Sequence, residues 1–241
     1  MRGVMNLIWA ASGAVVGLPA GTVLRGQVAR LSVPGGEPEE AGCRECATAL
    51  PGRPALRCEH CGSWIGAAAV IELTAAAVLA LLLARIGFQP AAAAFAFLGV
   101  LGVALAQIDA AVQRLPDRLT LAAYPALIVL LGLAAAFGDS WGTFVRALLG
   151  GLALGAAYLL LGLLSAGQLG GGDIKLAGVI GLVLGWLGWR TLIAGASLGF
   201  VMAAAVSLAM LAGRRISWRS MISFGPYMLS GALVAVLASR W

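Results

Sequence analysis

The sequence has few charged side chains, which make up 11% of its 241 residues. Soluble domains carry about 25% charged residues. The hydrophobic fraction is correspondingly high, at 61%, and the mean hydropathy is +0.97. This composition excludes a soluble globular protein and indicates a polytopic membrane protein, because a bilayer surrounds apolar surface that water would not stabilise.

Acidic residues are scarcer than basic ones, with ten of the former and sixteen of the latter, so the net charge is +6. In membrane proteins an excess of positive charge is typical of cytoplasmic loops. We therefore interpret the charge as a signal of topology and expect no nucleic-acid partner. The sequence also lacks an evident internal repeat, although inverted repeats are common in transporters.

Long apolar runs predict an all-α fold of about eight transmembrane helices, each near the roughly 20 residues that a bilayer requires. The first run imitates a signal peptide, but it is about as long as a full span, whereas the apolar part of a signal peptide has roughly 7–15 residues. We therefore expect a retained first helix. The sixth run is short and directly follows three glycines. The expected spans are residues 4–24, 65–84, 91–110, 119–137, 143–165, 174–188, 191–212 and 221–238.

The basic residues favour one orientation of these spans. With the N-terminus outside, eleven of them lie on the inner side and five on the outer side. This arrangement follows the positive-inside rule. We therefore expect a first transmembrane helix within residues 1–24, a small cytoplasmic insert at 25–64 and a transmembrane domain at 65–241, with membrane lipid around the helices.

All four cysteines lie in the expected insert, within the stretch CRECATALPGRPALRCEHC. Cys43 and Cys46 form one CxxC pair, and Cys58 and Cys61 form a second pair after eleven intervening residues. Two such pairs predict a tetrahedral zinc site, in which His60 could replace one thiolate. Disulfides and free thiols are the alternatives, and a reducing cytoplasm argues against disulfides. A closed four-thiolate site would be structural, and its metal would stabilise an insert too short to fold unaided.

Four carboxylates lie in or beside the expected spans, where charge is costly and indicates function: Glu72, Asp109, Asp117 and Asp173. Asp109 and Asp173 fall at the predicted cytoplasmic ends of their spans, at similar depth. Two carboxylates held close together share one proton. One can then activate water while the other protonates the scissile carbonyl and later the leaving amine. We predict that these two aspartates form such a dyad.

Glycines precede one member of the dyad in the stretch QLGGGDIKLAG. Gly170, Gly171 and Gly172 would let a substrate backbone approach Asp173 and would permit local unwinding at the membrane interface. The chain's single lysine, Lys175, follows two residues after the aspartate. We expect these residues to support the site.

The other two intramembrane carboxylates have more than one interpretation. Glu72 is either a buried polar contact of the second span or a supporting residue of the site. Asp117 follows Pro116 in LPDRLT, which is a helix-start pattern, so it could cap a helix or pair with the nearby Arg114 or Arg118. At the level of the whole chain, a proton-coupled transporter would use the same carboxylates, and a non-catalytic assembly factor would use the zinc segment for docking.

These motifs, taken in order, resemble the type IV prepilin peptidases, which are GxGD-type aspartyl proteases of bacterial membranes. The resemblance covers nearly the whole chain. It rests on the four-cysteine insert after the first span, on IELTAAA around Glu72, on ID ahead of RLPDRLTL, on GGGD followed by IK, and on FGPYM at 224–228.

The resemblance implies that Asp109 and Asp173 are the catalytic aspartates. It implies an endopeptidase of the bacterial inner membrane that removes the short basic leader of prepilins or pseudopilins at the cytoplasmic face. Many members also methylate the new N-terminus with S-adenosylmethionine. The linker between the cysteine pairs is shorter here than in fuller members, so N-methylation stays open for this chain.

Overall fold

The computed structural model describes residues 2–32, 42–43, 45–46, 48, 57–65, 69–138, 141–165, 169–213, 223–239 and 241. These residues form eight α-helices, and the described segments contain no β-strand beyond isolated bridges such as that between Arg57 and Trp64. The predicted all-α fold is therefore confirmed. The chain divides into two compact units, one made of residues 1–116 with Trp241 and the other of residues 117–240.

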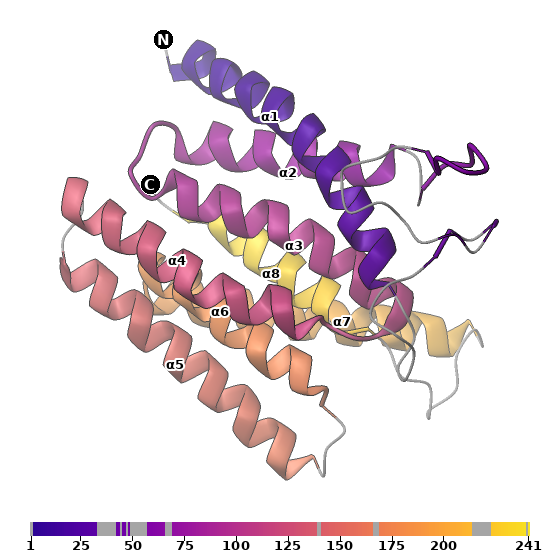
Figure 1. The fold of residues 1–241 in the computed structure, drawn as a ribbon. Helices are drawn as coiled ribbons and strands as arrows, with labels where there is room; N and C mark the ends of the chain where they lie inside the picture. The colour runs from indigo at the N-terminus through magenta and orange to yellow at the C-terminus, as the bar shows by residue number, and fades with distance from the viewer. Residues whose placement is uncertain are drawn as a thin grey trace. The chain divides into compact units, whose positions relative to one another are not determined.

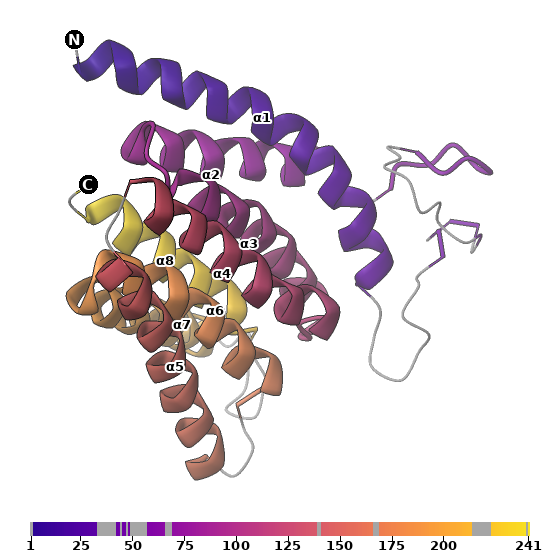
Figure 2. The same cartoon turned by 60° about the vertical axis from the view of Figure 1, so that its left-hand side comes forward.

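The first unit contains α1 (Arg2–Leu31), α2 (Val70–Ile86) and α3 (Ala92–Val112) (Figure 1). The helix α1 continues seven residues beyond the expected end of the first span at residue 24, into the segment expected to be the insert. It contains Pro19 and changes direction along its length (Figure 2). Proline explains such a bend, because it removes a helical hydrogen bond and its ring displaces the preceding turn.

Three glycines one turn apart bring α1 directly against the backbone of α2. A Cβ atom added at Gly13 would lie 2.6 Å from the carbonyl oxygen of Leu79, and Cβ atoms at Gly17 and Gly21 would overlap backbone atoms of α2. Small residues permit this close approach, and van der Waals contact then holds helices together in lipid. We call Gly13, Gly17 and Gly21 the glycine stripe.

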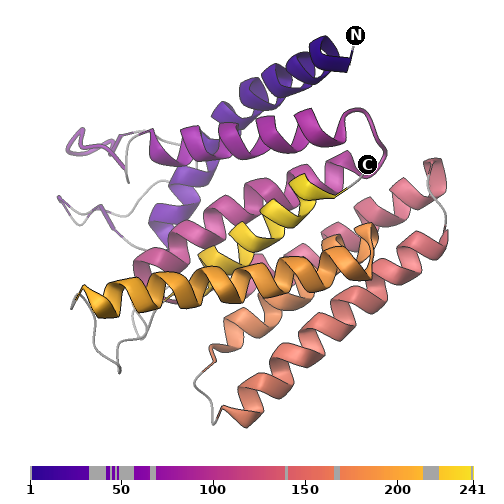
Figure 3. The ribbon, with the colours of Figure 1, turned by 180° about the vertical axis from the view of Figure 1, so that it is seen from behind.

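The second unit contains α4 (Asp117–Phe137), α5 (Trp141–Leu164), α6 (Gly171–Leu187), α7 (Trp189–Ala212) and α8 (Gly225–Ala238). Its centre is α6, which contacts the other four helices of the unit and is continuously buried from Leu176 to Trp186. Figure 3 shows α5 beside α6 and α7 beside α8. Glycines again permit these contacts, since a Cβ atom at Gly150 on α5 would lie 2.7 Å from the carbonyl oxygen of Gly181 on α6.

Five helices are long and apolar enough to cross a membrane: α1 from Val4, α3, α4, α5 and α7. The remaining described helices are shorter, at 17 residues for α2 and α6 and 14 for α8. Large apolar side chains face outward on the long helices, including Leu152 and Leu163 of α5 at 69% and 72% exposure. These features agree with the expected polytopic membrane protein. The helix α6 lies where the short sixth span was expected, but it begins at Gly171 instead of residue 174.

Candidate active site and metal centre

Asp173 lies in the first turn of α6, three residues after the N-cap residue Gly170. The backbone N–H of Asp173 donates to the carbonyl oxygen of Gly170 at 3.0 Å. The carboxylate turns back toward the same residue, because a Cβ atom at Gly170 would lie 3.3 Å from Oδ2 of Asp173. The partial positive charge of a helix N-terminus favours a carboxylate at this position. Asp173, which was expected at the end of a span, is therefore the third residue of α6.

Gly171, two residues before Asp173, leaves space around the start of α6. A Cβ atom at Gly171 would meet no described atom within 4 Å, and Gly171 is exposed while Asp173 is half-buried. A polypeptide backbone can come close to such a glycine, because no side chain intervenes. A role of these glycines in substrate approach stays a prediction.

An aromatic cluster includes a tyrosine that interacts electrostatically with Asp173. Tyr158 of α5 is 2% exposed and is close enough to Asp173 for an electrostatic interaction. The ring centroid of Tyr158 is 5.4 Å from that of Phe200 on α7 and 6.2 Å from that of Phe224. Phe224 begins the FGPYM motif, so the start of that motif lies against the ring of Tyr158. Sequence reasoning missed Tyr158, because a single tyrosine in an apolar span carries no distinguishing signal.

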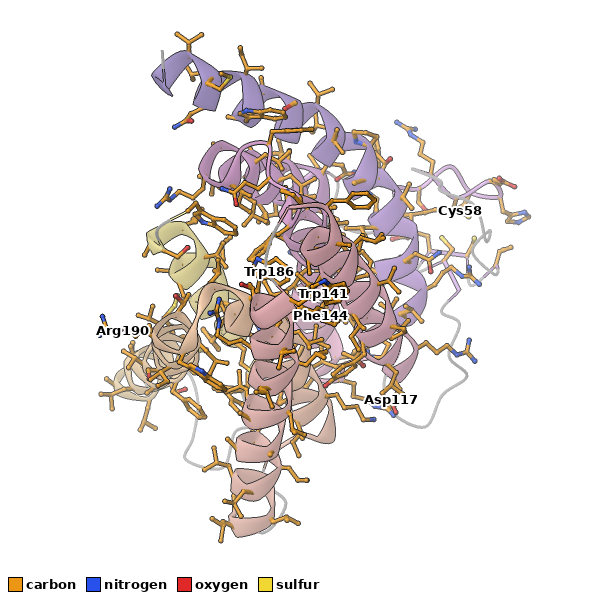
Figure 4. The ribbon with its side chains drawn as sticks, turned by 90° about the vertical axis from the view of Figure 1, so that its left-hand side faces the viewer. Cys58, Asp117, Trp141, Phe144, Trp186 and Arg190 are labelled. Carbon is orange, nitrogen blue, oxygen red and sulfur yellow. The ribbon has the colours of Figure 1, made fainter. Side chains whose placement is uncertain are left out.

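Lys175 joins the start of α6 to α4. Its Nζ donates to Oδ1 of Asp117 at 2.6 Å, and its carbonyl oxygen accepts a hydrogen bond from Oη of Tyr124 at 2.8 Å. Asp117 is the first residue of α4 (Figure 4), as the helix-start pattern predicted. The structure pairs it with Lys175, a partner that lies 58 residues away and was not foreseen.

The second predicted catalytic residue, Asp109, lies near the end of α3 in the first unit. It is 4% exposed, and its carbonyl oxygen accepts a hydrogen bond from the N–H of Gln113 at 2.8 Å. Gln113 adopts a left-handed conformation with φ of 53° and ends the helix. Because Asp109 and Asp173 belong to different units, the dyad stays a prediction.

Glu72 forms a buried ion pair with Arg25 within the first unit. The side chains of Arg25 and Glu72 are 4% and 9% exposed. The guanidinium carbon of Arg25 lies 5.7 Å from the ring centroid of Trp64, and that of Arg57 lies 4.6 Å from the same ring. This arrangement matches the interpretation of Glu72 as a buried polar contact, and it connects the two helices to the end of the cysteine-containing segment.

The four cysteines meet in one cluster whose sulfur atoms all lie within 4.8 Å of one another. The Sγ atoms of Cys43 and Cys61 are 3.6 Å apart, as are those of Cys46 and Cys58. Four thiolates around a tetrahedral zinc ion, at a Zn–S distance of about 2.3 Å, would be about 3.8 Å apart. None of the four forms a disulfide. The cluster fits a metal ion, and it consists of the thiols without His60.

The two cysteine pairs fold as matching turns. The backbone N–H of Cys43 donates to the carbonyl oxygen of Thr48, and that of Cys58 to Ser63, both at 2.8 Å. The hydrogen bond with the Ser63 hydroxyl lowers the pKa of the Cys43 thiol to about 6, and the contact with Thr48 lowers the pKa of Cys46. A lowered pKa favours the thiolate, which is the form that binds metal.

The part of the chain that contains both Asp109 and Asp173 is similar to known proteins. Residues 95–213 match the model of the type IV leader peptidase family. A prepilin leader peptidase/N-methyltransferase of Burkholderia pseudomallei (strain K96243) is 34% identical over 186 residues, which cover 73% of this chain and 56% of that protein. A protein of the same name from Dickeya chrysanthemi is 38% identical over 165 residues, covering 66% of this chain and 56% of that protein.

The chain spans about half the length of the curated relatives that it matches. No solved structure matches it. The matched segment nevertheless contains Asp109, Asp117 and the GGGD sequence, so the residues that suggested the chemistry lie inside the shared region. The similarity of residues 95–213 to the type IV leader peptidase family therefore includes both predicted catalytic aspartates.

Proposed function

We propose that the protein is an aspartyl endopeptidase of the bacterial inner membrane that removes the leader peptide from type IV prepilins or pseudopilins. The main support is the placement of Asp173 in the first turn of α6, two residues after a glycine with open space. The family of residues 95–213 and the names of the relatives support the same reaction. Basic residues on the expected inner side favour an active site that faces the cytoplasm.

The chemistry that we propose uses Asp109 and Asp173 as a pair with one shared proton. The ionised carboxylate takes a proton from water, whose oxygen attacks the scissile carbonyl carbon, while the protonated carboxyl donates its proton to the carbonyl oxygen. The resulting tetrahedral diol collapses when the aspartate that took the proton from water gives it to the leaving nitrogen. The other aspartate, now ionised, accepts a hydroxyl proton of the diol as the C–N bond breaks, so the pair again holds one proton. The glycines before Asp173 would allow the extended substrate backbone to reach the carboxylate.

We also propose that the cysteine cluster holds a structural zinc ion. The gathering of four sulfurs within 4.8 Å of one another supports this ion, because zinc is commonly bound by four thiolates. N-methylation of the processed N-terminus with S-adenosylmethionine is a second candidate activity. It is favoured by the N-methyltransferase names of the relatives.

The test of the peptidase is processing of a prepilin by the purified full chain in detergent. We expect Asp109→Asn and Asp173→Asn each to abolish leader removal, because an amide can neither accept nor donate the proton. Asp139→Asn is the matched control. This residue lies outside the described residues, between α4 and α5, and the exchange should preserve processing. Full processing by both dyad variants would contradict the proposal and would favour a transporter or an assembly factor.

A further inference from the structure

We infer that Asp117 is a positioning residue, which acts through Lys175 to hold the first turns of α6 and thereby the carboxylate of Asp173. This inference rests on the proposed function, since it concerns the same site. All the contacts that carry it lie within the second unit.

The first contact is the ion pair between the two helices. Nζ of Lys175 and Oδ1 of Asp117 are 2.6 Å apart, and the two side chains are 36% and 61% exposed. Lys175 lies two residues after Asp173 on α6, whereas Asp117 begins α4. The ion pair therefore connects the first residue of α4 to Lys175, which directly follows the first turn of α6.

The second contact attaches the backbone of the same lysine. Oη of Tyr124, two turns further along α4, donates to the carbonyl oxygen of Lys175 at 2.8 Å. The Tyr124 hydroxyl also occupies the space beside Gly178, where any side chain would overlap it. Thus α4 holds both the side chain and the main chain of Lys175, which fixes the position of α6 at this level.

The first turn of α6 needs such an attachment because of its composition. Two of its first three residues are glycines, and glycine is the least favourable helix former apart from proline. The opposite end is held separately, since Nε and Nη2 of Arg146 donate to the carbonyl oxygens of Gly185 and Trp186 at 3.0 and 2.6 Å. Loss of the Lys175 attachment would loosen the glycine end, where Asp173 lies.

The ion pair also predicts a salt response that a purely structural residue would not show. Because both side chains are partly exposed, dissolved ions screen their attraction. The screening length falls from about 30 Å at 0.01 M salt to about 3 Å at 1 M. The turnover of the wild-type enzyme should therefore fall with salt, whereas a variant without the pair should show no such dependence.

The experiment measures kcat and KM for prepilin processing by purified wild type, Asp117→Asn, Lys175→Gln, the double variant and the charge swap Asp117→Lys with Lys175→Asp. We expect each single variant to lower kcat about tenfold with little change in KM, since a displacement of about 1 Å can cost roughly 100-fold. The kcat of the double variant should be no lower than that of either single variant, and the charge swap should recover part of kcat. Among these five proteins, kcat should depend on salt only in the wild type and the swap.

Two results would overturn the inference. One is wild-type kcat in Asp117→Asn. The other is a loss in Asp117→Asn as complete as in Asp173→Asn while Lys175→Gln stays active, which would make Asp117 catalytic. Tyr124→Phe provides a second variant with both charges kept, and it should lower kcat while retaining the salt response. Processing by Asp173→Asn would instead refute the proposed function, so the two failures are distinguishable.

Discussion

Arg25 and Glu72 place two opposite charges in the interior of the first unit, with side-chain exposures of 4% and 9%. Nε and Nη1 of Arg25 have no hydrogen-bond partner among the described residues, so the guanidinium depends on Glu72 and on its contact with Trp64. A buried ion pair contributes little net stability over a well-packed apolar pair, but removal of one partner leaves a charge without compensation. At this position the two residues fix the register of α1 against α2.

We predict that Glu72→Ala destabilises the protein strongly, by about 3–5 kcal/mol, because it strands the Arg25 guanidinium in a buried site. The double variant Arg25→Leu with Glu72→Leu should be much closer to wild type. Thermal unfolding in detergent measures both. Equal losses in the single and the double variant would show that side-chain volume, and not charge, determines the effect.

At the scale of the helix, the glycine stripe of α1 and an ordinary glycine of α4 differ in what surrounds them. A Cβ atom at Gly17 would overlap the backbone of Ala76, whereas one at Gly132 would lie 3.7 Å from the ring of Phe144, an ordinary contact distance. Both glycines lie within helices. The same exchange to alanine should therefore have opposite effects at the two positions.

We predict that Gly17→Ala destabilises the α1–α2 pair by about 1–3 kcal/mol, the usual cost of forcing extra volume into a packed contact. Gly132→Ala should instead stabilise the protein by about 0.5–1 kcal/mol, because alanine is the better helix former. Thermal unfolding of the two variants side by side is the measurement. A stabilising Gly17→Ala would mean that α1 does not pack on α2 as described.

At the scale of the whole molecule, the sequence could predict the helices and the residue types of the site, but not their partners. Apolar runs of about 20 residues identify spans, because the bilayer sets their length. Their ends were less predictable. The helix α1 continues past Arg25, since Glu72 compensates the charge that seemed to end the span. Lys175 and Asp117 are 58 residues apart, and only the packing of α4 on α6 brings them together.

The last prediction concerns the metal content of the cysteine cluster. The four cysteines precede the segment of residues 95–213 that matches the peptidase family. We expect purified protein to contain about one zinc ion per chain and Cys58→Ser to lose it, because three thiolates bind the ion far more weakly. His60→Ala, which removes a ring that is not part of the cluster, should keep the metal. Elemental analysis of the three proteins measures this.

The same proteins test how far the metal supports the rest of the chain. Because metal binding provides folding free energy to small sites, Cys58→Ser should become sensitive to protease between residues 32 and 69. Prepilin processing should persist at a measurable level, since neither predicted catalytic aspartate lies in that segment. A metal-free wild type that resists protease there would refute the zinc proposal. Complete loss of processing in Cys58→Ser, with the helices still folded, would show that the insert takes part in the peptidase reaction.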